Sequence, residues 1–275
     1  MFRKLLAITA LGMLVAVPSV VSAQGQRAIE SGPGMEFPKT LKGAAAVDLA
    51  GTWVSVVTED WRWRMMTPPR GDYAAIPLNA EGRRVADLWD PVADEAMGLQ
   101  CRLFGAGSIM RLPGRFTFSW ADDDTLKIDI DAGTQTRLIH NIVNAKPPAG
   151  AEKTWQGHSV GGWEIPEGAL GKGEGNTYRA TSAQLKVTTS GFRSGYVRRN
   201  GVPYSENAQI TEYYVVVKAD NNDQWLVVTT IIDDPTYMNE LFTTSTHYKK
   251  ERDNSKFSPT SCVAYKEVII PGAVR

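Results

Sequence analysis

Three histidines are the side chains in this sequence best suited to proton transfer near neutral pH. All three, His140, His158 and His247, fall in segments with strand-like composition. Strands of one closed sheet converge on a shared interior, so we expect at least one ring to point into a pocket and act as an acid or a base. The alternative is that each histidine is a hydrogen-bonded core residue or faces solvent. A fold with all three outside the pocket would remove the preference for an enzyme.

An acid and a tyrosine near a turn complete the candidate catalytic set. Asp234 lies in an Asp-Asp-Pro turn and Tyr237 follows it closely. Such turns lie at strand ends, where the rim of a pocket would be. Structural salt bridges are the alternative explanation for the charged residues in these positions.

Aromatic and charged residues on the expected strands are candidates for substrate binding. Tryptophan faces stack on flat rings, and an arginine can stabilise a phenolate or enolate that develops during a reaction. The candidate binding residues are Trp61, Trp63, Trp155, Trp163, Arg62, Arg64, Arg137 and Glu164. They predict a small aromatic or apolar ligand.

The sequence lacks the signatures of several other chemistries. It contains no P-loop and no H-E-x-x-H motif. Its two cysteines and three scattered histidines have no recognisable zinc spacing, so we expect neither a metal nor a cofactor. The 30 basic and 30 acidic side chains give no electrostatic case for nucleic acid. The basic pair Arg198-Arg199 predicts solvent-exposed charge.

The N-terminus predicts export. Arg3 and Lys4 precede an apolar run, and small residues at positions 21–23 suit a signal peptidase, so we expect a signal peptide over residues 1–23 and a periplasmic or secreted product. A membrane anchor is the alternative, but the run is shorter than the roughly 20 residues of a spanning helix, and we expect no membrane span. An oxidising compartment favours a disulfide between Cys101 and Cys262 over two free thiols.

Period-two alternation predicts that most of the chain forms strands. We expect strands at 52–58, 61–65, 116–120, 126–130, 134–143, 154–165, 184–189, 210–217, 225–232 and 242–249. Helical signals follow the second of these strands: Asn79 can cap one helix, and Asp90-Pro91 starts a second stretch that runs up to Leu99. One or two short helices are therefore expected there.

Several phrases of the sequence resemble known proteins. Gly51-Thr52-Trp53 at the start of a first strand resembles the lipocalin signature. Longer phrases resemble a group of uncharacterised secreted bacterial proteins over roughly residues 51–250; they are Thr154-Trp155-Gln156-Gly157 with Ser159 and Trp163-Glu164, Arg198-Arg199-Asn200-Gly201-Val202-Pro203 with Ser205-Glu206, and Asp234-Pro235-Thr236-Tyr237. The resemblance implies a barrel-like fold and an exported location, and it implies no catalytic residue.

Many strands joined by short turns must either stack as two sheets or close on themselves, and closure removes edge strands. We expect a mainly β fold with a single antiparallel lipocalin-like barrel of about eight to ten strands over residues 47–275, preceded by an irregular arm over residues 24–46. A β-sandwich is the alternative.

Three functions fit these expectations. The preferred one is a cofactor-independent lyase or isomerase that acts by acid-base chemistry on a hydroxylated aromatic compound, such as one derived from plants or lignin. The alternative is a non-catalytic lipocalin-like carrier of an apolar ligand, and the third is a structural envelope protein whose barrel is filled by side chains. The several ionisable groups on the expected strands favour the enzyme slightly, because proton transfer needs such groups beside the ligand.

Overall fold

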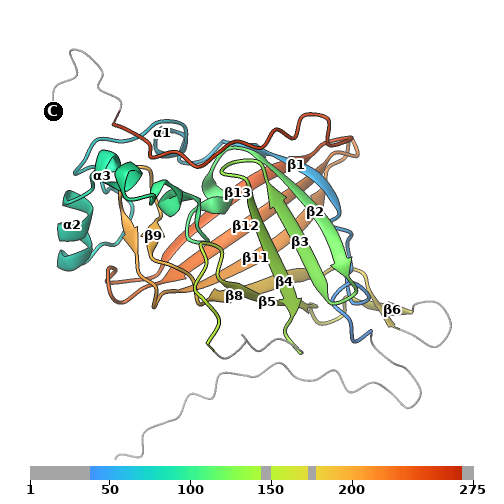
Figure 1. The fold of residues 1–275 in the computed structure, drawn as a ribbon. Helices are drawn as coiled ribbons and strands as arrows, with labels where there is room; N and C mark the ends of the chain where they lie inside the picture. The colour runs from blue at the N-terminus through green and yellow to red at the C-terminus, as the bar shows by residue number, and fades with distance from the viewer. Residues whose placement is uncertain (1–37, 144–149, 173–177, 268–275) are drawn as a thin grey trace, which may run out of the picture. The chain divides into compact units, whose positions relative to one another are not determined.

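Nine strands close into a barrel in the computed structural model, which describes residues 38–143, 150–172 and 178–267. Around the barrel the strands follow the order β1-β13-β12-β11-β8-β5-β4-β3-β2 (Figure 1). Their bounds are β1 Gly51–Val56, β2 Arg115–Asp122, β3 Thr125–Ile130, β4 Gln135–Asn141, β5 His158–Glu164, β8 Gln184–Ser190, β11 Gln209–Lys218, β12 Gln224–Asp233 and β13 Phe242–Lys250. The expected signal peptide and the arm up to residue 37 lie outside the described residues.

The barrel is mixed and not purely antiparallel. β4 and β5 run parallel, with Ile139 opposite Ser159, while the other neighbouring pairs of the barrel are antiparallel. The expectation of an antiparallel barrel is wrong at this pair. A short turn cannot join parallel strands, because the connection must return along the sheet. The alternation of residues along a strand does not reveal its direction.

The two ends of the barrel carry different elements (Figure 1). The hairpin of β6 (Leu170–Lys172) and β7 (Tyr178–Ala180) lies at one end. At the other end we define the cap as residues 57–114 and 191–208. It contains the helices α1 Trp61–Met65, α2 Ala80–Asp87 and α3 Pro91–Ala96, the 3-10 turns Gln100–Phe104 and Ile109–Arg111, and the hairpin of β9 Gly195–Tyr196 and β10 Pro203–Tyr204.

Helix α1 occupies residues that the sequence predicts as a strand. The alternation places Trp61 inside, yet Trp61 is 62% exposed while Arg64 is buried. The Arg64 guanidinium donates to the Arg111 carbonyl at 2.8 Å and to the Glu59 carboxylate. These partners satisfy a buried charge, so the alternation of aromatic and charged residues does not force this segment into a strand. The prediction of a strand over residues 61–65 is wrong.

Helices α2 and α3 begin where their capping residues predict. The Asn79 side chain accepts a hydrogen bond from the Gly82 amide at 2.8 Å, and the Asp90 side chain accepts one from the Val92 amide at 2.9 Å. Each cap satisfies backbone donors that have no partner within the helix. In the part of the chain that the structure describes, no helix is long and apolar enough to cross a membrane.

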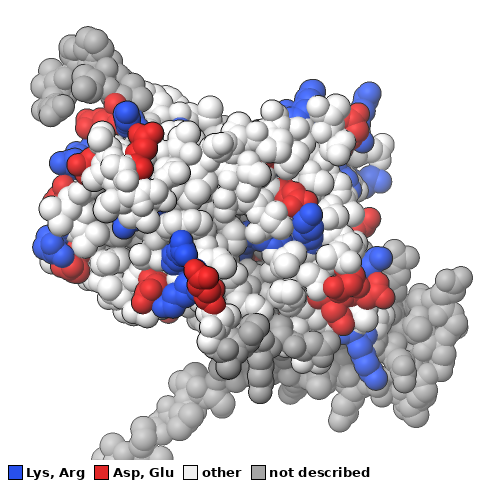
Figure 2. All heavy atoms as spheres, in the orientation of Figure 1, with Lys and Arg blue, Asp and Glu red and all other residues white. Residues whose placement is uncertain are grey.

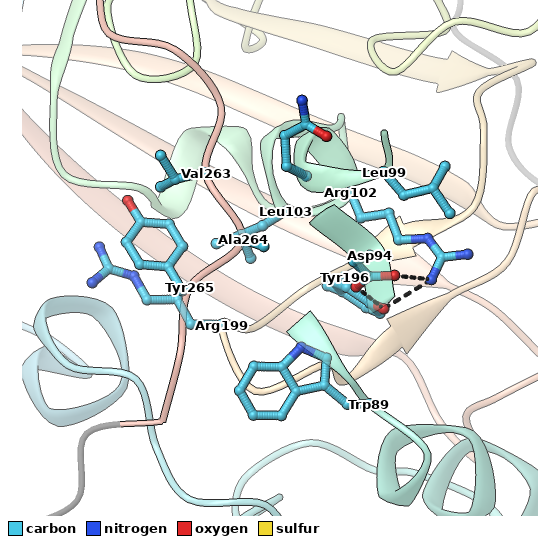
Figure 3. Close-up of a pocket in the computed structure, with 11 residues that line it drawn as sticks. Trp89, Asp94, Leu99, Arg102, Leu103, Tyr196, Arg199, Val263, Ala264 and Tyr265 are labelled. Atoms are coloured by element: carbon cyan, nitrogen blue, oxygen red, sulfur yellow. Dashed lines mark hydrogen bonds and ion pairs between the residues drawn. The ribbon is translucent and has the colours of Figure 1, made fainter. Parts of the chain in front are cut away.

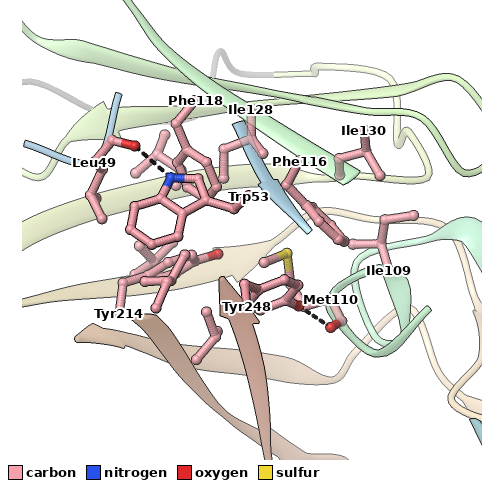
Figure 4. Close-up of a cluster of buried hydrophobic side chains, with 14 of the residues drawn as sticks. Leu49, Trp53, Ile109, Met110, Phe116, Phe118, Ile128, Ile130, Tyr214 and Tyr248 are labelled. Carbon is pink, nitrogen blue, oxygen red and sulfur yellow. Dashed lines mark hydrogen bonds between the residues drawn. The ribbon is translucent and has the colours of Figure 1, made fainter. Parts of the chain in front are cut away.

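Packed aromatic side chains fill the barrel between its walls (Figure 4). Trp53, Phe116, Phe118 and Tyr248 are fully buried and come from strands that lie side by side. The Tyr248 hydroxyl donates to the carbonyl of Met110, a cap residue. The cap therefore closes its end of the barrel by inserting backbone and side chains among the strands.

The chain after β13 runs from the last strand to the cap as a strap, residues 251–267. The Glu251 amide donates to the Thr52 carbonyl on β1, and the Thr260 amide donates to the Asp131 carbonyl at the end of β3, both at 2.8 Å. Beyond them Cys262 is bonded to Cys101, with their Cα atoms 5.1 Å apart, which confirms the expected disulfide. The bond fixes the strap against the cap.

Candidate functional site

A hollow lined by four guanidinium groups lies in the cap. It is narrow, with a cavity volume of about 10 Å³, and it opens to solvent. We call it the arginine cleft; its polar and aromatic walls are Arg64, Arg111, Arg198, Arg199, Trp63 and Ser108. Arg64 comes from α1, Arg111 from the second 3-10 turn, and the other two arginines from the turn that joins β9 to β10.

The β9–β10 turn holds Arg198 and Arg199 in place. Gly201 closes the turn with φ of 78°, and a Cβ atom there would lie 2.2 Å from the Trp89 ring, so only glycine fits. The side chain of Asn200 is fully buried and donates to two backbone carbonyls at 3.0 Å each. Both features fix the backbone from which the two arginines extend.

Two of the four arginines are paired with acids. Arg64 forms an ion pair with Glu59, and Arg111 forms one with Asp60 at 3.0 Å. Burial lowers the pKa of Arg111, and the Asp60 carboxylate opposes that shift. These two pairs are electrically balanced, so they contribute little net charge to the cleft.

The other two arginines bind only backbone oxygen in the part of the chain that the structure describes. Arg198 donates to the carbonyls of Asp72 at 3.3 Å and Ala74 at 2.9 Å, and Arg199 donates to the Met65 carbonyl at 3.2 Å. Burial, with repulsion from Arg111, lowers the pKa of Arg198 to about 10. Burial also lowers the pKa of Arg199. Both groups stay cationic at neutral pH and leave the cleft with excess positive charge.

Three guanidinium nitrogen atoms in the cleft are buried and have no hydrogen-bond partner among the described residues: Arg64 Nη2, Arg198 Nε and Arg199 Nε. Each carries hydrogen in the planar, always charged guanidinium group. Arg198 also lies over Trp63, with its guanidinium carbon 4.7 Å from the ring centroid. The arginines that line the cleft therefore have hydrogen-bonding capacity that the described residues do not use.

The arginine cleft brings together some of the expected binding residues. Trp63 and Arg64 line it. Arg62 and Trp61 extend from the exposed side of the same helix, where Arg62 pairs with Asp72 at 2.7 Å. The remaining expected binding residues lie elsewhere in the molecule.

Arg137 lies inside the barrel and not at a pocket rim. Two of its nitrogens donate to the Glu212 carboxylate, at 2.7 and 3.2 Å, and one also donates to the Thr189 hydroxyl at 3.1 Å. Burial lowers the pKa of Arg137, but the adjacent carboxylate raises it above its ordinary value overall. Both side chains are fully buried, so this ion pair ties β4 to β11 through the interior of the barrel.

The histidines lie on the outer face of the barrel wall. Their sequence neighbours Ile139, Ser159 and Tyr248 are buried, and residues along a strand alternate between faces. The expectation that one ring points into the barrel is therefore wrong. The rings of His140 and His158 stack on each other with centroids 5.2 Å apart. A catalytic role for these residues stays a prediction.

His247 has an acidic partner on that outer face. Its Nδ1 atom lies 2.8 Å from Glu59 Oε2, and the other oxygen of Glu59 accepts from Arg64. Burial raises the pKa of Glu59, but the contacts with His247 and Arg64 lower it overall. Glu59 thus connects His247 to one wall of the arginine cleft.

Asp234 and Tyr237 support the cap. The Asp234 carboxylate accepts from the Ser205 amide at 2.6 Å and from the Ser205 hydroxyl at 2.7 Å. The backbone carbonyl of Tyr237 accepts from the Asn79 amide at 2.9 Å, and burial raises the pKa of its phenol. These contacts join β10 and α2 to the connection between β12 and β13. Their expected catalytic role stays a prediction.

The other expected binding residues do not meet at one site. Trp155 packs under Arg193, with 5.5 Å between the guanidinium carbon and the ring centroid. The indole nitrogen of Trp163 donates to the Leu41 carbonyl at 2.8 Å. Glu164 pairs with Lys186 at 3.0 Å.

The sequence predicts the wrong environment for Arg198 and does not single out Arg111. Arg198 is only 3% exposed, so the expectation of solvent-exposed charge is wrong for it. The Asn200-Gly201 dipeptide after the arginine pair is typical of a tight hairpin turn. That signal could have located the turn, although it says nothing about what packs against it.

Within the described ranges, no group of three or more histidine, cysteine, aspartate or glutamate side chains is placed to hold a metal ion. No protein-family model, curated protein or solved structure matches the chain.

Proposed function

We propose that the chain is an exported binding protein in which the arginine cleft binds the acid group of a small anion. The observation that carries this proposal is the set of unpartnered guanidinium nitrogens on Arg64, Arg198 and Arg199, which line one hollow. Buried donors without partners are uncommon because each one has lost its hydrogen bonds to water. A carboxylate, sulfate or phosphate group would supply the missing acceptors.

Electrostatics support an anion as the ligand. Arg198 and Arg199 lack an acidic partner among the described residues, and the depressed pKa of Arg198 reflects burial beside another cation. A bound anion would relieve both effects. The charge excess is local, because the whole chain carries 30 basic and 30 acidic residues and Figure 2 shows the two kinds interspersed over one face.

A carrier fits the geometry better than acid-base catalysis within the barrel. Histidines on the outer wall cannot transfer protons to a ligand enclosed by the strands. Lyase or isomerase chemistry on a hydroxylated aromatic compound remains the alternative, and the contact between His247 and Glu59 favours it, since Glu59 also touches Arg64.

The alternative predicts that His247→Ala abolishes conversion while the thermal transition stays nearly unchanged. The imidazole is half-exposed, so its removal should change the free energy of unfolding by less than about 1 kcal/mol. Mass spectrometry of the purified protein incubated with phenolic compounds measures conversion. The carrier predicts that the added compounds are recovered unaltered.

The proposed location is the periplasm or the medium, with residues 1–23 removed as a signal peptide. The disulfide between Cys101 and Cys262 is compatible with an exported protein. N-terminal sequencing of the protein from its native cells should give Gln24 as the first residue. A chain that retains Met1 and stays with the cytoplasmic fraction would contradict export.

Binding of small anions tests the proposed function. In low-salt buffer, benzoate, acetate or sulfate should raise the thermal transition temperature, because a ligand of the folded state stabilises it. Arg198→Met should weaken binding by about 10- to 100-fold, since a charge-assisted hydrogen bond contributes about 1.5–3 kcal/mol.

Two further variants make this test specific. Arg199→Met loses a single hydrogen bond to backbone and should lower affinity without unfolding the cap. Arg84→Met removes the same charge from an exposed pair with Glu81 and should leave affinity unchanged. Equal loss in all three variants, or no binding by the unaltered protein, would contradict the proposal.

A further inference from the structure

A larger hollow lies at the end of the barrel opposite the cap. It encloses about 450 Å³, opens to solvent, and is lined by the end of β5, the start of β8, one residue of β11 and the two connections to the β6–β7 hairpin. We call it the end hollow. Pockets for small molecules commonly hold roughly 300–1,000 Å³, so the end hollow has room for a ligand.

Three neighbouring strands form one wall of the end hollow. Glu164 at the end of β5 lies opposite Gln184 at the start of β8. Tyr214 of β11 lies opposite Leu185 of β8, so Val215 comes next to Gln184 in the same row. Leu185 and Tyr214 are buried in the barrel, and side chains alternate between faces. The row of Glu164, Gln184 and Val215 therefore lies on the outer face.

The connections to the β6–β7 hairpin form the other wall. Residues 165–166 follow β5, and residues 182–183 precede β8. The Ala169 amide donates to the Pro166 carbonyl at 3.0 Å, and the Thr181 amide donates to the Ala169 carbonyl at 2.7 Å. These backbone hydrogen bonds tie the two connections together, so the wall is formed before a ligand binds.

The lining of the end hollow is largely uncharged. Apolar surface comes from four side chains, Ile165, Pro166, Ala183 and Val215. Glu164 is the one charged residue among the described residues that line it, and it pairs with Lys186 at 3.0 Å. Because this pair leaves no net charge for an ionic ligand to neutralise, a neutral and largely apolar molecule fits better than an ion.

The polar part of the wall offers hydrogen-bond acceptors. The Glu164 carboxylate accepts from the Lys186 ammonium and from the Gln184 side-chain nitrogen, the latter at 2.9 Å. A carboxylate has about four acceptor positions, so capacity remains. The side-chain oxygen of Gln184 has no hydrogen-bond partner among the described residues. Both residues line the end hollow and bind each other, so their acceptors lie together beside one space.

The hollows of the cap have no room for such a molecule. The arginine cleft encloses about 10 Å³, and so does the neighbouring hollow that Trp89, Tyr196 and Tyr265 line (Figure 3). In the latter, Asp94 accepts from Arg102 and from the Tyr196 hydroxyl, both at 2.7 Å, so these polar groups pair with one another. About 10 Å³ is the space of one water molecule.

We infer that the end hollow is a second binding site, for an uncharged and largely apolar molecule that carries a hydroxyl or N–H donor. The apolar body of the ligand lies against Val215 and the two connections, and the donor meets the acceptors of Glu164 and Gln184. Glu164 is also one of the binding residues that the sequence predicts. The inference goes beyond the proposed function, because it needs neither the arginine cleft nor an anion.

A neutral fluorescent probe tests the end hollow. N-phenyl-1-naphthylamine joins two aromatic groups by an N–H, and its emission rises in apolar surroundings. Its emission should rise saturably with the unaltered protein. In competition, 1-phenoxynaphthalene, which has oxygen in place of the N–H, should bind about 3- to 10-fold more weakly, as expected for the loss of one hydrogen bond. Benzoate, which should bind in the arginine cleft, should not displace the probe.

A larger side chain tests where the probe binds. Ala183→Phe fills the end hollow and should weaken the probe by about 10-fold or more. Ala121→Phe adds the same ring at an exposed position of β2 and should leave probe binding unchanged. Thermal unfolding of both variants checks that they fold. Equal probe binding by Ala183→Phe and the unaltered protein would place the probe elsewhere and overturn the inference.

A second variant tests the acceptors. Glu164→Leu combined with Gln184→Leu should abolish the preference for the N–H probe over its oxygen analogue. Glu206→Leu breaks an exposed pair of the same length, with Lys153 at 3.0 Å, and should keep the preference. A preference that persists in the double variant, or no saturable binding of the probe to the unaltered protein, would overturn the inference. Neither result bears on anion binding in the arginine cleft, so the two proposals stand or fail separately.

Discussion

Replacing Arg137 with methionine is expected to destabilise the fold by about 3–5 kcal/mol, because it leaves the Glu212 carboxylate buried without a cation. Both side chains of the pair are fully buried. The Tyr214 hydroxyl still donates to Glu212 at 3.3 Å, but a neutral donor cannot replace the guanidinium charge. Urea unfolding followed by tryptophan fluorescence measures the loss.

A second variant distinguishes the buried charge from the packing of the side chain. Arg137→Met combined with Glu212→Gln removes both charges, and it should recover part of the stability lost in the single variant. Arg84→Met, which breaks an exposed pair with Glu81, should leave the free energy of unfolding nearly unchanged. A loss below 1 kcal/mol in Arg137→Met would show that the pair is hydrated and does not join the barrel walls.

Removing the disulfide by Cys101→Ser with Cys262→Ser is expected to lower the free energy of unfolding by as much as about 5 kcal/mol. The two cysteines are 161 residues apart in the sequence, and a closed loop of that length restricts the unfolded chain strongly. Urea unfolding of the double variant and the unaltered protein in the absence of reductant measures the difference. Coincident transitions would contradict this expectation.

The same double variant tests the position of the strap. Cys262 lies between Thr260 and Tyr265, and the Tyr265 ring centroid lies 4.3 Å from the Arg199 guanidinium carbon, so loss of the bond should loosen the strap beside Arg199. Hydrogen exchange should become faster at Thr260, whose amide donates to the Asp131 carbonyl on the barrel. Unchanged exchange would show that the strap holds its place without the disulfide.

Local pattern was sufficient to predict much of the wall of the barrel. Leu126, Ile128 and Ile130 alternate with polar residues and are buried in β3, as period two requires. The pattern could not give strand direction, since the parallel β4–β5 pair depends on a connection that returns along the sheet. The alternation of apolar and polar residues also predicted that Trp61 would lie inside. That prediction was wrong because alternation takes no account of the hydrogen-bond partners that allow Arg64 to be buried instead.

The candidate site was less accessible to sequence reasoning. The sequence predicts Trp63 and Arg64 as binding residues. Arg111 and Arg198 line the same cleft but come from segments far apart in the chain, so sequence patterns do not connect them. A guanidinium group on a turn looks solvent-exposed until the surfaces that cover it are known. The sequence located the histidines on strands but did not give the face of the strand on which each one lies. Because side chains alternate between the two faces, an error of one residue moves a side chain from the interior to the outer wall.

The most direct test of the anion site is an NMR titration of the arginine side-chain Nε–H signals with benzoate. Saturable shifts are predicted for Arg198 and Arg199, whose Nε atoms lack partners among the described residues, and no saturable shift is predicted for Arg84, whose Nε already donates to Glu81 at 2.8 Å. Arg198→Lys and Arg199→Lys assign the two signals. Signals of Arg198 and Arg199 that stay unmoved, or that drift linearly together with that of Arg84, would contradict an anion site in the arginine cleft.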